Sequence, residues 1–406
     1  MALRKRDMNK VYITAAAAFA PSGTSVDEIF AGIALANSAT ARLESFNVDH
    51  FPVSHGGEVR HDGEVVLTPA GTDRKSFFIE QAVGQVIEMS DLSRYAPEKR
   101  QIHLGTGIDY FDIENYVNSS RALTGEWQAD CAHSHLAVKR LAEKYDLKGG
   151  QSANVAACVA STQSIGLACR IVRSDPATAV VSGGYDSMLC HLHYLGFYKL
   201  GALSDWTGDP SQACRPFDKN RRGLVLGEGA VAFLLESSAK AVPERILAEI
   251  CGYSSTMDAW LVTDPDPSGE QLARAALQAI SEAGITPDQI DCVHLHGTGT
   301  HKNAPAEASA MKRIFSDRYA EIPVYSMKGQ IGHLIGACGA MEILAVIWSM
   351  QNGKVPVTVN YDEPDPEVGL NVIRGRPLDL DIKYVLKLNA AFGGQNTAIV
   401  MRRFDA

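Results

Sequence analysis

The stretch Ala156-Ala157-Cys158-Val159-Ala160-Ser161 marks the point where a buried strand passes directly into a helix. The small-residue run 153–157 predicts the strand, and the amphipathic run 159–173 predicts the helix. Backbone N–H groups and the positive end of that helix would face the sulfur of Cys158 and lower the pKa of its thiol. Cys158 is therefore a candidate nucleophile, although a cysteine that begins a helix is, taken alone, more often structural.

Two histidines in glycine-marked loops accompany this cysteine. His296 follows the predicted strand 292–295 and opens the turn His296-Gly297-Thr298-Gly299-Thr300. His333 lies in a second loop, just before the predicted helix 337–351. Either histidine alone could cap a strand or sit satisfied in the core. A cysteine with two imidazoles and no metal motif together indicates acyl-thioester chemistry at carbon.

Strands alternate with helices along the chain, which predicts an α/β fold with buried sheets. The other expected strands are 11–14, 102–105, 179–184, 230–236, 245–252, 323–326, 385–388 and 397–402. The other expected helices are 73–90, 269–284, 305–316 and one opened by Ser25. No low-complexity linker divides the chain, so we expect domains 1–250 and 251–406 to form one compact unit.

Composition excludes several classes of function. The 406 residues are 46% hydrophobic and 21% charged, as in globular proteins, and the net charge of -9 argues against nucleic acid as a ligand. No apolar window is long enough for a membrane span. The eight cysteines lack paired-ligand spacing and no secretory segment is recognisable, which predicts a reduced, cytoplasmic protein. No dinucleotide fingerprint is present.

The chain resembles the β-ketoacyl synthases of the type II, carrier-protein-dependent kind, within the thiolase superfamily, over roughly residues 10–403. The motifs that carry the resemblance are Ala157-Cys158 with the following helix, 214–230, 296–300, 328–339 and 392–396. The resemblance implies two duplicated βαβαβαββ halves stacked in five α-β-α-β-α layers. The first half would carry the nucleophile and the second the two histidines, in a homodimer or a heterodimer with a related chain.

The resemblance also implies a decarboxylative Claisen condensation. An acyl group is held on the cysteine, malonyl-acyl carrier protein is the second substrate, and carbon dioxide and a β-ketoacyl thioester are released. The implied catalytic residues are Cys158, His296, His333, Lys328, Glu342 and Phe392, the last with an oxyanion-hole N–H. The implied substrate-binding residues are Thr298 and Thr300 for the phosphopantetheine arm, Ile108 and Asp109 near the acyl pocket, and Gly393 and Gly394 in the gating loop. No metal or other cofactor is implied.

Departures from the family pattern fall on the pocket, the gate and the docking face. The gating loop has Ala391 where glycine is usual and Ala390 where a phenylalanine is usual. Docking on an acidic carrier protein would use other bases than usual, and the candidates are Arg74, Lys75, Arg121 and Arg215. This pattern favours specialised polyketide, polyene or lipid biosynthesis over housekeeping fatty-acid elongation.

Three alternatives remain open. A thiolase would need a second reactive cysteine in the loop at Phe392, and none is there. A synthase primed by acyl-coenzyme A would pair its cysteine with histidine and asparagine. A non-catalytic chain-length partner of a heterodimer would lack the nucleophile, whereas Cys158 is present.

Overall fold

The computed structural model describes residues 9–69, 72–109 and 134–405. Five strands of the first half form one side of an eleven-stranded sheet, in the order β1-β9-β8-β6-β7. They are β1 (Val11–Phe19), β6 (Arg100–Thr106), β7 (Gln151–Val155), β8 (Ala179–Ser187) and β9 (Glu228–Ser237). Strand β6 runs parallel to β7 and β8, whereas β9 runs antiparallel to β8 and β1.

The second half repeats this arrangement in the order β10-β17-β16-β11-β12. These strands are β10 (Ala248–Met257), β11 (Cys292–His294), β12 (Pro323–Tyr325), β16 (Tyr384–Ala390) and β17 (Gln395–Arg402), and β14 (Asn371–Val372) extends the edge. Strand β11 runs parallel to β12 and β16, and β17 runs antiparallel to β16 and β10. Because order and direction recur, the predicted duplication is confirmed.

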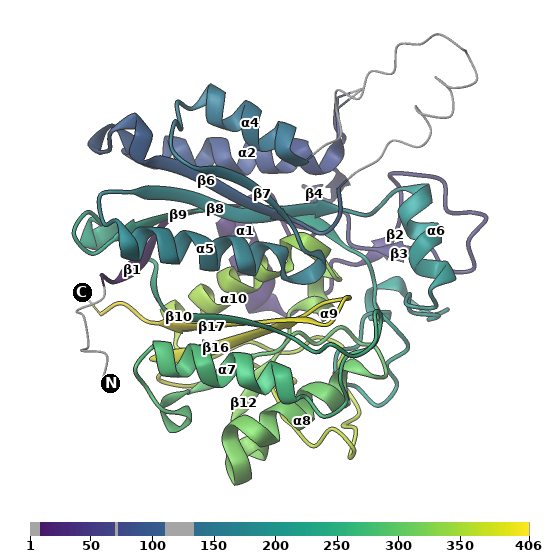
Figure 1. Ribbon diagram of the computed structural model, residues 1–406. Coiled ribbons are helices and arrows are strands. Elements are labelled where there is room, and N and C mark those ends of the chain that lie inside the picture. The colour runs from purple at the N-terminus through teal and green to yellow at the C-terminus, as the bar shows by residue number, and fades with distance from the viewer. Residues whose placement is uncertain (1–8, 70–71, 110–133, 406) are drawn as a thin grey trace.

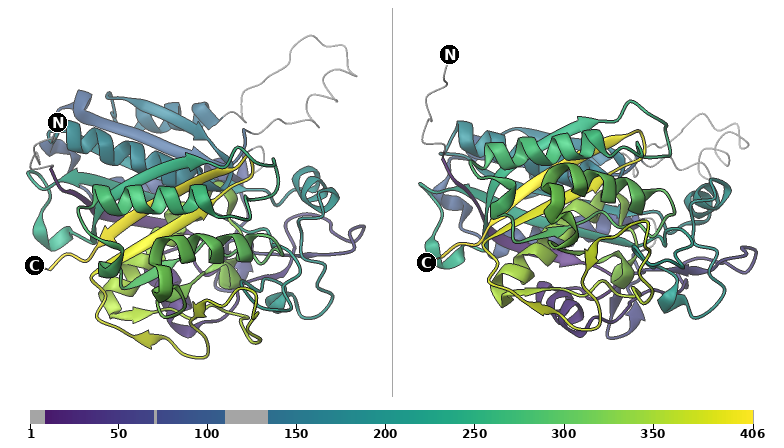
Figure 2. Two further views of the ribbon diagram at one scale, coloured as in Figure 1. Left: turned by 60° about the horizontal axis from the view of Figure 1, so that its bottom comes forward. Right: turned by 90° about the horizontal axis from the view of Figure 1, so that it is seen from below.

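Helices complete five layers, which also confirms the prediction (Figure 1). The outer layers are α2 (Arg74–Glu88) with α4 (Ser134–Lys144) on the first half, and α7 (Glu270–Glu282) with α8 (Asn303–Phe315) on the second. Figure 2 shows α7 and α8 over the outer face of the second half. The central layer holds α5 (Ala160–Ser174) and α10 (Cys338–Asn352), which pack against each other.

The two halves share one sheet because the start of β1 pairs with the start of β10, Val11 opposite Ile250. The boundary at 250/251 stays a prediction, and it falls within β10. Helix α10 is buried on all sides, because it lies between the two halves of the sheet. Strand β1 runs past its predicted end to Phe19, because its run of alanines is small enough to be covered on both faces.

Smaller elements flank this core. Helix α1 (Val26–Leu35) begins as predicted, with the Ser25 hydroxyl accepting the N–H of Glu28. Two short two-stranded ladders lie between α1 and α2: β2 (Ala41–Arg42) with β3 (His55–Gly56), and β4 (Arg60–His61) with β5 (Glu64–Val65). The remaining ladder pairs β13 (Lys354–Val355) with β15 (Leu378–Asp379). Helices α4 and α6 (His191–Lys199) were not predicted. Among the described residues, no helix has the length and apolarity needed to cross a membrane.

Candidate active site

Cys158 lies in a tight turn, residues 157–159, between β7 and the start of α5. Ala157 adopts φ 45°, a left-handed conformation uncommon for alanine, and its N–H donates to the Gly107 carbonyl at 2.9 Å. The strained turn places the Cys158 side chain at the head of α5, with 6% of the residue exposed. The predicted position of the cysteine between strand and helix is confirmed.

The predicted ionisation of Cys158 is wrong. Burial raises the pKa of its thiol to about 12, although Lys328 and the Phe392 backbone N–H both lower it. Desolvation of a thiolate in this enclosed position outweighs the favourable charges around it. Burial therefore favours the neutral thiol at Cys158 in the unliganded protein.

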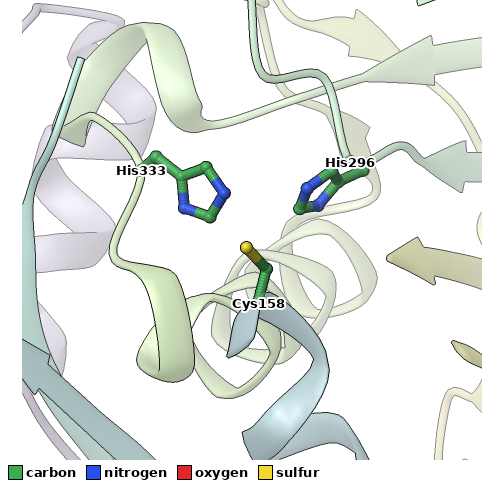
Figure 3. A group of neighbouring side chains, drawn as sticks. All are labelled: Cys158, His296 and His333. Atoms are coloured by element: carbon green, nitrogen blue, oxygen red, sulfur yellow. The ribbon is translucent and has the colours of Figure 1, made fainter. Parts of the chain in front are cut away.

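Both predicted histidines face the sulfur (Figure 3). His296 follows β11, and His333 follows the short helix α9 (Lys328–Ile331). One ring nitrogen of each histidine and the Cys158 sulfur all lie within 4.8 Å of one another. The two rings are 5.2 Å apart between centroids and nearly perpendicular, at 85°. Residues from three distant parts of the chain thus share one small volume.

Hydrogen bonds fix which nitrogen of each ring carries the proton. Lys328 Nζ and Asn389 Nδ2 approach His296 Nδ1 at 3.2 and 3.1 Å, and both are donors. The Ile335 N–H donates to His333 Nδ1 at 3.0 Å. In a neutral imidazole the other nitrogen then holds the hydrogen. Burial, followed by the charge of Lys328, lowers both histidine pKa values well below the usual range, so both rings are neutral with an Nε2–H.

A buried ion pair supports His296 from behind. Lys328 Nζ donates at 2.5 Å both to the His296 carbonyl and to Glu342 Oε1, and both side chains are only 1% exposed. Burial raises the pKa of Glu342, but Lys328 and Lys387 outweigh it and bring the pKa to about 2. Glu342 is therefore ionised and holds Lys328 in place, as the sequence resemblance implied.

Asp186 ties together the loops that carry the nucleophile and His333. This fully buried carboxylate accepts the Gly107 N–H at 2.7 Å and the Gly336 N–H at 2.9 Å. Gly107 in turn accepts from Ala157, next to the cysteine. One carboxylate thereby sets the spacing between Cys158 and the His333 loop.

A pocket of about 480 Å³, its open mouth included, leads to these side chains. Its polar lining includes Thr298 and Thr300, whose hydroxyls lie 2.8 Å apart. The full lining comprises Cys158, Phe197, Leu224, Thr263, Pro265, His296, Thr298, Thr300, Asn303, His333, Ile335, Ala390, Ala391 and Phe392. An apolar channel with a few hydroxyls suits an acyl chain or a pantetheine arm.

Four predicted substrate-binding residues do not line this pocket. The Ile108 carbonyl accepts from Lys75 at 2.8 Å, and Asp109 accepts the N–H and the hydroxyl of Ser134 at the start of α4. Gly393 and Gly394 turn the gating loop with φ of 83° and 75°, and the Gly393 N–H donates to Val262. Their substrate-binding roles stay predictions.

The prediction of docking bases is wrong for three of the four residues. Arg74 is paired with the buried Glu228, Lys75 is 3% exposed, and Arg215 is paired with Asp218 and Asp362. Arg74 and Arg215 are neutralised by carboxylates within the fold and Lys75 is buried, so none of the three presents a free, exposed charge to a partner. Arg121 lies outside the described residues.

The cluster of Cys158, His296 and His333 also has the residue types of a zinc site, and within the described ranges it is the one such group. A metal-bound histidine usually donates its second N–H to an acceptor. Here each Nδ1 faces donors instead, so a metal on Nε2 would force two N–H groups against them. The site fits a metal poorly, which supports the prediction that none is required.

Three residues beside the histidines were missed from the sequence. Lys387 and Asn389 extend the ion pair, and the Cys338 sulfur lies 3.1 Å from His333 Nδ1. A lysine and an asparagine inside the apolar strand 384–390 were the available signal. No sequence signal marked Cys338, because a cysteine at the start of a helix is indistinguishable from a small buried core residue.

Taken together, a buried thiol, two imidazole N–H donors and an apolar pocket define a cysteine-dependent acyl-transfer site on a duplicated α/β fold. The family models described as "Beta-ketoacyl synthase, N-terminal domain" and "Beta-ketoacyl synthase, C-terminal domain" match residues 8–241 and 247–362. The chain therefore belongs to the β-ketoacyl synthase family.

Relatives of known name agree. The chain is 30% identical over 410 residues to "3-oxoacyl-[acyl-carrier-protein] synthase 2" of Staphylococcus aureus (98% of this chain, 99% of the relative). It is 29% identical over 414 residues to the Synechocystis protein of the same name (98% and 99%). These two relatives are thus matched along almost their whole length.

Solved structures show the same fold. One is a "type II PKS acyl-carrier protein in complex with its ketosynthase bound to the hexaketide", with TM-score 0.86, 26% identity and coverage of 98% of this chain and 100% of that chain. Another is a "Beta-ketoacyl synthase from Burkholderia phymatum", with TM-score 0.85, 27% identity and the same coverage.

Proposed function

We propose that this protein is a ketosynthase that joins an acyl group on Cys158 to a malonyl unit delivered by an acyl carrier protein. The observation that carries the proposal is the pair of imidazoles beside one thiol, each with its Nδ1 facing a donor, from which we infer that Nε2 carries the hydrogen. Two neutral donors suit a carbonyl oxygen that gains negative charge, whereas they are poorly placed to act as bases.

In the first half-reaction, the Cys158 sulfur attacks the carrier's acyl thioester. The oxyanion forms beside the backbone N–H groups of Cys158 and Phe392, the second of which already lies against the sulfur. Collapse breaks the bond to the phosphopantetheine sulfur, which leaves as a thiol with the proton that Cys158 gives up. The acyl group then occupies the apolar part of the pocket.

In the second half-reaction, the malonyl thioester places its carbonyl between His296 and His333. Loss of carbon dioxide leaves the electron pair of the broken carbon–carbon bond on the thioester, which becomes an enolate. The enolate oxygen accepts hydrogen bonds from both Nε2–H groups. The enolate carbon attacks the acyl carbonyl on Cys158, and the carbon–sulfur bond breaks. Cys158 takes up a proton from solvent, and the β-ketoacyl thioester leaves on the carrier.

The proposal also states that the protein acts in specialised rather than housekeeping biosynthesis. Ala390 and Ala391 both line the pocket, so the pocket wall lacks the phenylalanine usual at position 390. The added room suits acyl chains bulkier or more rigid than saturated ones, as in polyketide, polyene or unusual lipid synthesis. A panel of saturated, polyunsaturated and β-keto acyl carriers tests this point, and a preference for short saturated chains would contradict it.

The proposal includes partners and location. An acyl carrier protein supplies both substrates, and a second, identical or related chain completes a dimer. Strand β7 ends the sheet among the described residues and leaves Val155 48% exposed, which supports a partner at that edge. A solved relative of 25% identity is a "ketosynthase/chain length factor".

A cytoplasmic location stays a prediction, supported by seven free cysteines in the described ranges.

Mass spectrometry after incubation with an acyl carrier thioester tests the proposal. We expect an acyl adduct on the wild-type protein and none on Cys158→Ala. Cys158→Gln should lose condensation yet release more carbon dioxide from malonyl carrier. Failure of every carrier and coenzyme A thioester to label the protein would instead favour a non-catalytic chain-length partner.

A further inference from the structure

Behind His296 lies a second buried cation that the reaction above does not use. Lys387 on β16 is fully buried, and its Nζ lies 3.3 Å from Glu342 Oε2, on the side of the carboxylate away from Lys328. Lys387 also donates to Thr162 Oγ1 at 2.7 Å and to the Asn389 side-chain oxygen. Glu342 therefore stands between two ammonium groups, with Asn389 beside them.

These charges leave the Asn389 side chain one orientation. Its Oδ1 accepts from Lys387 and from the Thr162 hydroxyl, and its Nδ2 donates to Glu342 Oε2 at 2.6 Å. A flipped amide would point its oxygen at the carboxylate and its N–H groups at the ammonium. Both contacts would be repulsive in a site closed to water, so the flip is excluded.

The fixed amide has one remaining N–H, and it points at His296. Asn389 Nδ2 lies 3.1 Å from His296 Nδ1, where an N–H group is acceptable only if Nδ1 carries no proton. Lys328 contacts the same nitrogen at 3.2 Å, but its two shortest bonds go to the His296 carbonyl and to Glu342. The ammonium has three N–H groups, so its third can also reach Nδ1, and the Asn389 amide is the second, uncharged donor to the ring.

We propose that Asn389, oriented by Lys387 and Glu342, is a positioning residue that keeps the proton of His296 on Nε2. This inference rests on the proposed function, because only a carbonyl acceptor between the histidines needs that tautomer. It also gives the buried Lys387 a role, because its ammonium group holds the Asn389 amide oxygen so that the amide N–H faces the His296 ring.

The test compares two near-isosteric substitutions. Asn389→Asp replaces the donor at Nδ1 with a carboxylate oxygen, which attracts the ring proton to Nδ1 and removes it from Nε2. Malonyl decarboxylation should then fall by about 10²–10³-fold, the usual cost of removing an oxyanion donor. Asn389→Leu removes the donor and adds no acceptor, so the loss should be smaller, about tenfold, as for one lost hydrogen bond. Acylation of Cys158 should change by less than about threefold in both variants, since it does not use the His296 N–H.

Nitrogen-15 spectra of ring-labelled histidine report the tautomer directly. The wild-type signal of His296, assigned with a His296→Gln variant, should show protonated Nε2 and bare Nδ1, and Asn389→Asp should reverse the pattern. Asn352→Asp is the matched control: the same chemical change at the end of α10, where the amide donates to the Trp348 carbonyl, should leave the spectrum unchanged.

The outcomes separate the two proposals. A wild-type protein that neither accepts an acyl group nor decarboxylates malonyl carrier overturns the proposed function. A wild-type protein that condenses but holds the His296 proton on Nδ1 overturns this inference alone, even if no variant folds. Unchanged decarboxylation in a folded Asn389→Asp variant would overturn it too.

Discussion

Replacing Glu342 with glutamine should destabilise the protein strongly, because the change leaves two buried ammonium groups without a counter-charge. The pKa of Glu342 is held at about 2 against an ordinary 4.5, which corresponds to about 3 kcal/mol of favourable interaction. Removal of one partner from a buried ion pair typically costs about 3–5 kcal/mol, so the two arguments agree. Urea denaturation at pH 7, followed by circular dichroism, measures the loss.

The pH dependence of this effect has a defined sign. The unfolded chain binds the Glu342 proton more tightly than the folded protein does, since the folded pKa is the lower one. The stabilisation is therefore complete above about pH 4.5 and is lost as the pH falls towards 2. The difference between wild type and Glu342→Gln should narrow over that range.

A surface glutamate provides the control. Glu80 pairs with Arg140 at 3.0 Å, and their side chains are 33% and 47% exposed, so Glu80→Gln should leave the urea midpoint nearly unchanged. If Glu342→Gln unfolds at the wild-type urea concentration at pH 7, the two lysines do not depend on the carboxylate and the reasoning fails.

Three other changes have clear expectations. Burial lowers the pKa of Lys387 to about 8, so wild-type stability should gain from this group as the pH rises from 8 towards 10.5, and Lys387→Met should lack that gain in urea titrations at several pH values. Gly336→Ala should lower the free energy of unfolding by about 1–3 kcal/mol in a thermal unfolding assay, because the new Cβ would lie 2.2 Å from the Gly107 nitrogen. The same change should slow Cys158 acylation. Normal acylation would count against the view that Asp186 sets the spacing between Cys158 and the His333 loop. Cys338→Ala should keep malonyl decarboxylation within about threefold of wild type, because the Ile335 N–H still bonds His333 Nδ1, and a large loss would show that the thiol is the main donor.

The fold class and the three reacting side chains could be predicted from the sequence, because both depend on local sequence patterns. Alternating strands and helices predicted an α/β fold with buried sheets, the strand-to-helix junction predicted the position of Cys158, and the glycine-marked loops predicted those of His296 and His333. The duplicated halves and the five layers were implied only by the resemblance to a family. The resemblance to a family then supplied Lys328 and Glu342, which the structure brings into contact at 2.5 Å.

The errors have physical causes that a sequence does not display. The thiol pKa of Cys158 depends on burial, and burial is set by loops far away in the chain. Arg74, Lys75 and Arg215 read as surface bases, yet each has its polar partners within the fold. Asn389 acquires its role only when β16 meets the His296 loop.

The central claim is that two neutral imidazoles hold one thioester oxygen together. Carbon dioxide release from malonyl-carrier thioester should be measured at pH 7 for the single variants His296→Ala and His333→Ala and for the double variant. Because both rings donate to the same developing charge, each single variant should lose most of the rate and the double variant little more. A single variant that decarboxylates at the wild-type rate would contradict the account.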